Sequence, residues 1–433
     1  MTTRPGTVHS PRRALRDGIG HHLVTRRPPD TPPGSADDIP DAPRMDHVRV
    51  AIVTESFLPA LNGVTTSVCK VLECLREQGH EALVIAPGTS PWSPVMTPEH
   101  YAGFPVHTVT SLPVRKFRVG LPSYELETVL HRFRPDVVHV ASPFVLGVRG
   151  LVAARALGIP SVAIYQTDMP SYIRQHAGPA GDLTARATWR WIRRIHEQAD
   201  LTLAPSTSAV ADLAAHHVPR VALWGRGVDS DLFHPDRRRD PAAGALHATL
   251  APRGETVLGY VGRLAPEKEL HRLTELASLP GTRLVLVGEG PSREILQAQL
   301  PEAVFLGRRE GAELARAYAA FDVFVHTGTR ETFGQTLQEA SAAGLPVVAP
   351  ARGGPVDLIE PGETGALFDP DVQGTLREAV LPLVGAGPEE QERRRRLGAA
   401  GRRRVEERSW PALVDQLVGH YSRVVHKAAF SVA

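Results

Sequence analysis

Short apolar runs alternate with helical segments from Val48 almost to the end of the chain, and this alternation limits the fold to one class. The first series of runs comprises 48–54, 82–86, 136–140, 161–165, 201–205 and 221–225, and the second comprises 256–262, 283–288, 303–307, 322–326 and 345–349. Continuously apolar strands separated by helices indicate parallel sheets that are covered on both faces. Two such series predict an α/β protein with two doubly wound, Rossmann-like domains.

The domain limits follow from the ends of the two series. We expect a first domain over 45–222, a second over 223–408, and a single amphipathic helix within 409–433. Residues 1–44 contain eight of the chain's 38 prolines and show no periodic apolar pattern. Because that composition cannot bury a core, we expect a disordered extension, with Met45 as a candidate natural start.

The bulk composition argues against several classes of protein. A formal net charge of +2 gives no global basic field for nucleic acid. The two cysteines, Cys69 and Cys74, lie five positions apart on one expected helix, so neither a disulfide nor a metal pair is expected. This cysteine usage favours a reducing cytoplasm. No apolar run approaches the roughly 18 residues that span a bilayer.

Ligands of open parallel sheets bind beyond the carboxyl ends of the strands, so the residues after each run are the candidate site. After 322–326 comes the stretch TRETFGQTLQEASAAG, which carries Glu331 and Glu339. We expect a helix from about Gly334 to Gly344, whose first N–H groups and dipole favour an anion such as phosphate. The two glutamates then suit sugar hydroxyls; the alternative is that both are ordinary solvated helix acids.

Two cations follow the run 256–262. Arg263 and Lys268 lie five positions apart across an expected junction between a loop and a helix. A guanidinium and an ammonium group suit a diphosphate, and they would stabilise the charge that develops when it leaves. The alternative is a surface pair, with Lys268 bridging Glu267 or Glu269.

Polar residues also follow runs of the first series. Asn62 and Gly63 form a turn signal directly before a helix, and Gly63 would let the backbone approach a phosphate or an acceptor. There is no G-x-G-x-x-G at this place, so the dinucleotide fingerprint is missing. Gln166 and Asp168 follow the run 161–165, where Asp168 would bind or deprotonate an acceptor hydroxyl or cap the next segment. His139 is interpreted as a core histidine rather than a catalyst.

Two Asp-x-Asp pairs need weighing, because such pairs bind metal in some sugar transferases. Asp229 and Asp231 read as a loop turn, and Asp369 and Asp371 surround a proline and read as a turn with a helix cap. Neither pair is therefore expected to hold a metal.

Six segments in a fixed order resemble glycosyltransferase family 4, retaining enzymes of the GT-B fold. They are ESFLPALNGV, GRGVDSDLFHP, GYVGRLAPEKEL, LVGEGP, ETFGQTLQEASAAGLPVVA and GGPVDLIEPGETGALF, and the resemblance covers about 48–425. It implies that Glu331 contacts the transferred sugar and Glu339 the ribose, and that Arg263 and Lys268 grip the diphosphate.

The resemblance also assigns the remaining site residues. The backbone of Phe333, Gly334 and Gln335, with Thr336 beside them, would hold sugar and phosphate, and Gly63 would approach the donor. The acceptor would meet Asn62, Gln166 and Asp168. The C-terminal helix would cross back onto the first domain.

One position departs from the family pattern, because many relatives carry a histidine where this chain has Gln166. Glutamine cannot act as a base. The loss is tolerable if the reaction proceeds on one face of the sugar and the departing phosphate oxygen takes the acceptor proton.

The segments VTESFLPALNGVTTSV and YQTD are most similar to bacterial GDP-mannose-dependent α-mannosyltransferases, which act on glycolipid acceptors. The resemblance thus implies a GDP-mannose donor, a glycolipid acceptor and no cofactor or required metal. Alternatives are a UDP-sugar donor within the family, a sugar-nucleotide epimerase, and a non-catalytic nucleotide-binding protein.

Two basic segments with aromatic residues predict peripheral contact with an anionic membrane at its cytoplasmic face. Segment 112–124 places Arg115, Lys116 and Arg118 around Phe117, and segment 186–198 places Trp189 and Trp191 among four arginines. Basic residues attract anionic lipid, and aromatic side chains favour the interface. The alternative is that these are solvated charges beside core aromatics.

Overall fold

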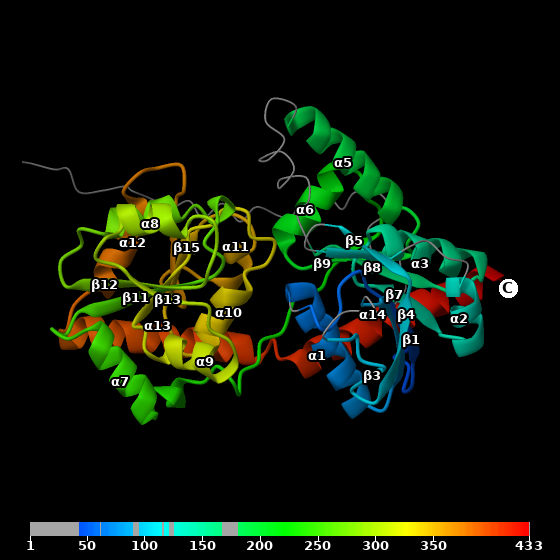
Figure 1. Cartoon of the computed structure of the whole chain (residues 1–433), viewed down its shortest axis with the longest axis horizontal. Helices are drawn as coiled ribbons and strands as arrows, with labels where there is room; N and C mark the ends of the chain where they lie inside the picture. The colour runs from blue at the N-terminus through cyan, green and yellow to red at the C-terminus, as the bar shows by residue number, and fades with distance from the viewer. Residues whose placement is uncertain are drawn as a thin grey trace, which may run out of the picture. The chain divides into compact units, whose positions relative to one another are not determined.

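The computed structural model describes residues 43–432, apart from 61, 90–94, 115–116, 121–124 and 167–180. The extension expected at 1–44 therefore lies outside the described residues, except for its last two positions. Within the described part, two sheets of mainly parallel strands carry helices between their strands (Figure 1), so the predicted α/β class is confirmed.

The first sheet has eight strands within the described residues, in the order β10-β9-β8-β7-β1-β2-β4-β3. These are β1 (Arg49–Val53), β2 (Glu81–Pro87), β3 (His100–Tyr101), β4 (Phe104–Val109), β7 (Val137–Val140), β8 (Ser161–Ile164), β9 (Leu201–Ala204) and β10 (Val221–Leu223). Only the β3–β4 pairing among them is antiparallel. All six predicted runs are strands, whereas β3 and β4 were not predicted, nor was the hairpin of β5 (Ser111–Val114) and β6 (Phe117–Gly120).

The second sheet has six parallel strands within the described residues, in the order β13-β12-β11-β14-β15-β16. These are β11 (Thr256–Val261), β12 (Thr282–Val287), β13 (Val304–Gly307), β14 (Val323–Val325), β15 (Val347–Pro350) and β16 (Gly365–Phe368). The five predicted runs are confirmed, and β16 was missed.

Helices connect the strands. In the first half they are α1 (Gly63–Glu77), α2 (Glu125–Phe133), α3 (Val145–Ala156), α5 (Gly181–His196) and α6 (Thr207–Ala215). In the second half they are α7 (Pro241–Leu250), α8 (Arg293–Gln299), α9 (Gly311–Ala319), α10 (Gln335–Ala342), α11 (Pro355–Leu358), α12 (Thr375–Val380) and α13 (Pro388–Glu406). Short 3₁₀ turns are η3 (Pro235–Arg239), η4 (Pro266–Lys268), η5 (Leu270–Leu276) and η6 (Leu381–Leu383), and α14 (Trp410–Val432) ends the chain.

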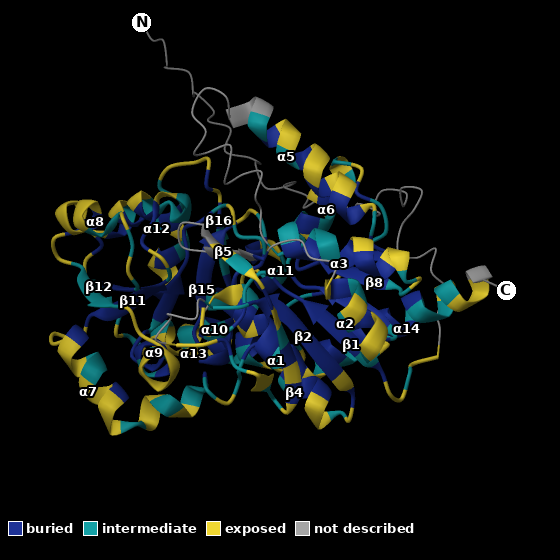
Figure 2. Ribbon diagram, turned by 45° about the vertical axis from the view of Figure 1, so that its right-hand side comes forward, coloured by how far each residue is buried: buried dark blue, intermediate teal, exposed yellow. Residues whose placement is uncertain are grey.

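The central strands of each sheet are buried on both faces, and they are the dark strands of Figure 2. Successive residues of β1 enter different cores, because side chains of a strand alternate between its faces. Val50 and Ile52 join one cluster, while Ala51 and Val53 join another. The second sheet divides in the same way over two further clusters.

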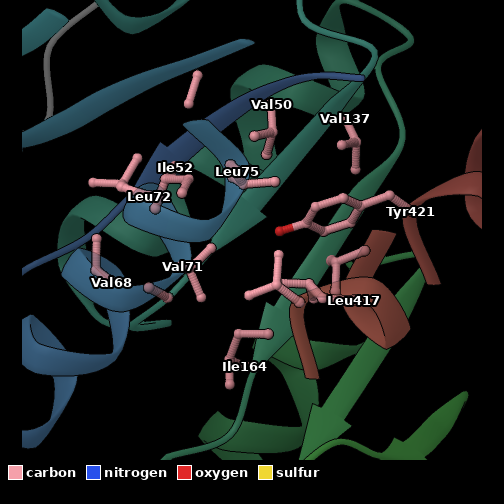
Figure 3. Close-up of a cluster of buried hydrophobic side chains, with 14 of the residues drawn as sticks. Val50, Ile52, Val68, Val71, Leu72, Leu75, Val137, Ile164, Leu417 and Tyr421 are labelled. Carbon is pink, nitrogen blue, oxygen red and sulfur yellow. The ribbon is translucent and has the colours of Figure 1, made fainter. Parts of the chain in front are cut away.

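Helix α14 packs on the first sheet, although it follows the second sheet in sequence. Leu417 and Tyr421 lie in one cluster with Val50 and Ile52 (Figure 3). The indole of Trp224 donates a hydrogen bond to the Leu413 carbonyl at 2.9 Å. Among the described residues, no helix is both long and apolar enough to cross a membrane.

Candidate active site

The loop between β14 and α10 forms the centre of the site. Helix α10 starts at Gln335 and ends at Ala342, close to the expected limits. Its N-cap, Gly334, has φ +105°, a left-handed conformation that favours glycine, and contributes no side-chain cap. The first N–H groups of α10 are therefore not covered by a capping side chain, which leaves them suited to bind an anion.

Glu331 lies in this loop and accepts a hydrogen bond from the Lys268 ammonium, so two of the predicted site residues meet directly. The two side chains are 18% and 26% exposed. Burial acts to raise the pKa of Glu331. The opposing effect of Lys268, followed by His326 and Arg226, is larger in sum, so the pKa lies below its usual value. Glu331 is therefore an ionised carboxylate at neutral pH, held beside a cation.

Arg263 lies on the same side of the second sheet, after β11, but it pairs with Glu267 rather than with Glu331. Its side chain is 56% exposed. The alternative considered for these cations was a surface pair in which Lys268 bridges Glu267 or Glu269. Lys268 instead pairs with Glu331, and it is Arg263 that pairs with Glu267.

Glu339 faces a different environment one turn inside α10. The Tyr318 hydroxyl donates to its carboxylate at 2.8 Å. Burial raises the pKa of Glu339 to about 7, and the Tyr318 hydrogen bond opposes this shift. The pKa values of the two glutamates of the motif are thus shifted in opposite directions, and both groups are desolvated, which argues against two ordinary solvated helix acids.

The segment after β10 holds the start of α10 in place. Gln335 donates to the Gly227 carbonyl at 3.2 Å, and Gln338 donates to the Arg226 carbonyl at 3.1 Å. Phe333 is buried, and the Thr336 carbonyl accepts from Tyr318 at 3.2 Å. The side chain of Gln335 is therefore in use within the protein, and its backbone remains the part suited to a ligand.

Asn62 and Gly63 begin α1, as the turn signal predicted. The Asn62 side-chain oxygen accepts from the N–H groups of Val64 and Thr65 at 3.0 and 3.1 Å, which makes it the N-cap. The side-chain oxygen of Asn62 is therefore occupied by hydrogen bonds within α1. Gly63 stands beside the Arg226 guanidinium, since a Cβ there would lie 3.2 Å from Nη1.

Gln166, at the end of β8, is held from both sides. Its amide nitrogen donates to the Ala141 carbonyl at 2.9 Å, and its oxygen accepts from Arg226. Its backbone carbonyl accepts from Thr332 at 3.5 Å, next to Glu331. Asp168, the other acceptor residue expected here, lies outside the described residues.

His139 is a core residue, as interpreted from the sequence. Its side chain is 3% exposed, and Nδ1 lies 2.5 Å from the Tyr421 hydroxyl. Burial lowers its pKa to about 3, so it is neutral and has no catalytic charge.

Sequence reasoning missed two residues next to Glu331. The His326 ring is buried, and its Nε2 lies 3.5 Å from a Glu331 oxygen. Arg226 interacts electrostatically with the same carboxylate. The available signals were positional: His326 ends a predicted strand, and Arg226 stands inside GRGVDSDLFHP.

The Asp-x-Asp pairs serve local structure. Asp229 accepts from the Leu232 N–H at 2.9 Å, and Asp369 accepts from the Asp371 N–H at 2.9 Å. Asp371 also pairs with Arg352. Over the part of the chain that the structure describes, no three or more His, Cys, Asp or Glu side chains group as metal ligands.

Two family patterns match the chain. Glycosyltransferase Family 4 matches residues 61–232, and Glycosyl transferases group 1 matches residues 246–404. With the two parallel sheets, they define an enzyme of the glycosyltransferase class with the GT-B fold. The chain belongs to glycosyltransferase family 4, as the six segments indicated.

Relatives and solved structures agree with this assignment. A GDP-mannose-dependent alpha-mannosyltransferase of Mycobacterium tuberculosis is 50% identical over 384 residues, covering 88% of this chain and 98% of the relative. A protein of the same description from Mycolicibacterium smegmatis is 48% identical, covering 89% and 100%. The crystal structure of Anabaena HepE in complex with UDP has a TM-score of 0.67 at 20% identity, covering 86% of this chain and 98% of that one, and shows the shared fold.

Proposed function

We propose that this enzyme is a retaining α-mannosyltransferase that moves mannose from GDP-mannose to a hydroxyl of a lipid-linked glycan. The observation that carries the donor is the 50% identity to a GDP-mannose-dependent enzyme across nearly its whole length. The geometry around Glu331 supports a transferase that stabilises a diphosphate leaving group. We further propose domains over 45–222 and 223–408, with 409–433 returning to the first, and action at the cytoplasmic face of the membrane.

In this proposal the donor binds at the mouth of α10. The backbone of Phe333, Gly334 and Gln335, with Thr336, binds the diphosphate and sugar, and Gly63 approaches it from α1. Glu339 holds the ribose, so that Glu339→Ala weakens nucleotide binding. Arg263 turns from Glu267 to phosphate at small cost, since exposed ion pairs contribute only about 0–1 kcal/mol.

Lys268 binds the diphosphate while it remains close to Glu331, which contacts the transferred mannose. The bond between the anomeric carbon and the diphosphate oxygen breaks, and the acceptor oxygen forms its bond on the same face. The acceptor proton passes to the departing oxygen. Cations and helix N–H groups stabilise the charge that develops, so no metal ion is required and the reaction proceeds in excess EDTA.

The acceptor meets Asn62, Gln166 and Asp168 in this proposal. Gln166 is neutral and held at both ends, so it positions rather than deprotonates. A UDP-sugar donor is the alternative within the family.

A donor panel tests the assignment. We would incubate the full chain with GDP, UDP and ADP, measure thermal stability, and then assay transfer from the corresponding sugars with EDTA present. A nucleotide at 100 times its dissociation constant adds about 2.7 kcal/mol to the free energy of unfolding. Stabilisation by GDP with transfer from GDP-mannose is expected. Stabilisation by UDP alone would overturn the donor and leave the family intact.

A further inference from the structure

Arg226 stands on the segment between β10 and η3, and its backbone is fixed on two sides. Its carbonyl and that of Gly227 accept hydrogen bonds from side chains of α10. A Cβ on Gly227 would lie 2.6 Å from the Trp410 ring, so this backbone is pressed against the start of α14. The guanidinium therefore projects from an anchored point.

The guanidinium reaches three parts of the site. One nitrogen donates to Gln166, whose amide is fixed by its bond to the Ala141 carbonyl at 2.9 Å. Nη1 stands beside Gly63 at the start of α1. Burial lowers the pKa of Arg226 to about 10, and the Glu331 carboxylate opposes this shift. Arg226 is therefore still a cation at neutral pH.

This cation differs from its neighbours in its pairing. Lys268 is paired with Glu331, and Arg263 is paired with Glu267. Among the described residues, no carboxylate forms an ion pair with Arg226, and its hydrogen-bond partner is the neutral Gln166 amide. A desolvated charge is costly unless it is paired, and a guanidinium has five N–H groups to offer.

We propose that Arg226 is a third cation for the donor diphosphate, and that Gln166 is the positioning residue that aims it. The planar fork of a guanidinium matches phosphate oxygens, and the adjacent start of α1 also favours negative charge. As the bond from the anomeric carbon to the diphosphate breaks, one further negative charge develops on the leaving oxygen, and Arg226 donates hydrogen bonds to it without giving up a proton. This inference rests on the proposed function for the presence of a diphosphate.

Glutamine at position 166 fits this role. Its oxygen accepts from Arg226 at every ordinary pH, whereas a protonated histidine there would repel the guanidinium. Gln166→His therefore introduces a group whose protonation displaces Arg226. We expect that variant to lose turnover on the acidic side, at a pH where the wild type is unaffected.

The main test compares nucleoside diphosphate with monophosphate. We would measure binding of GDP and GMP to the wild type, Arg226→Met and Arg226→Lys. Arg239→Met is the matched control, because Arg239 is an 85% exposed arginine in η3, downstream on the same connecting segment. We expect Arg226→Met to weaken GDP at least tenfold while GMP changes less than threefold, and Arg226→Lys to recover part of the loss.

The outcomes separate this inference from the donor assignment. If the wild type binds UDP instead, the same comparison is made with UDP and UMP. That result would refute GDP-mannose as the donor, while a selective loss of UDP binding in Arg226→Met would still support Arg226 as a third cation. Unchanged GDP binding with a raised acceptor KM would place an acceptor anion at Arg226 and overturn the proposal, as would an equal loss for GDP and GMP. Should Arg226→Met fail to fold, Arg226→Lys and Gln166→Leu give the same comparison.

Discussion

Lys268 and Glu331 form an ion pair at the proposed donor site, and Arg263 is the second cation proposed to bind the diphosphate. We expect Glu331→Ala, Arg263→Ala and Lys268→Ala each to lower turnover at least tenfold while the protein still unfolds cooperatively. Losing one preorganised electrostatic group from an active site costs roughly 2.7–4 kcal/mol of transition-state stabilisation. Steady-state kinetics with thermal unfolding of the same samples provide the measurement. Arg239→Ala is the control, and wild-type kinetics in all three variants would refute the proposed roles.

The raised pKa of Glu339 predicts that the protein becomes less stable as the pH rises. Its pKa in the folded protein is about 7, above the 4.5 of an unperturbed glutamate. Between these values the folded state holds a proton that the unfolded state releases, so the free energy of unfolding falls as pH rises through this window. Urea unfolding from pH 4.5 to 8 should show a flatter profile for Glu339→Gln. The exposed Glu313 offers a control substitution, and equal slopes in wild type and Glu339→Gln would contradict the assignment.

At the scale of elements, the start of α10 allows a matched comparison of two glycines. Gly334 and Gly374 are N-caps of α10 and α12, with φ +105° and +92°. Alanine in a left-handed conformation costs roughly 1–2 kcal/mol, so both Gly→Ala variants should lose stability. At Gly334 the added Cβ also meets Leu337 at 3.1 Å, whereas at Gly374 nothing lies within 4 Å. Only Gly334→Ala should weaken donor binding, which titration calorimetry with the nucleotide measures. If α10 were not the donor site, the two variants would bind the nucleotide equally well.

The strands with the clearest pattern in the sequence are those buried on both faces. The run TVLGYVG gives β11 because every residue of that strand is buried, so an unbroken apolar run marks it. In contrast, β4 mixes buried, intermediate and exposed positions, and β16 is a four-residue strand of which half is only partly buried. Such short or half-exposed strands depend on their neighbours in the sheet and leave little pattern in the sequence.

At the scale of the whole molecule, the site depends on contacts between distant parts of the chain. The position of Glu331 at a strand end could be predicted, but its bond to Lys268 spans 63 positions, and the bond from Arg226 to Gln166 spans 60. Whether Arg226 meets Gln166 depends on the path of the segment after β10, which also contacts α10. Sequence reasoning therefore identified several strand-end residues, but it missed His326 at the end of one predicted run and Arg226 on a connecting segment.

The predicted membrane contact can be assessed on helix α5, because the basic pair Arg115 and Lys116 of the other segment lies outside the described residues. Trp189 is buried and stacks on His216 at 3.7 Å, so it belongs to the core. Trp191 is 38% exposed and stands edge-on to Phe144, which is also 38% exposed. Exposed positions recur along α5 (Figure 2), and they include the arginines at 186, 190, 193 and 194.

We expect this surface to bind anionic vesicles in a salt-dependent manner. Each basic residue near an anionic surface contributes about 1 kcal/mol, so reversing Arg190 and Arg194 to Glu should weaken binding at least thirtyfold. Arg395→Glu with Arg396→Glu on α13 makes the same change in net charge and should have a smaller effect. Co-sedimentation of the full chain with anionic and neutral vesicles, at about 0.1 and 1 M salt, measures this, since screening shortens from about 10 to 3 Å. Equal, negligible binding to both vesicles would favour a soluble acceptor and leave the donor site unchanged.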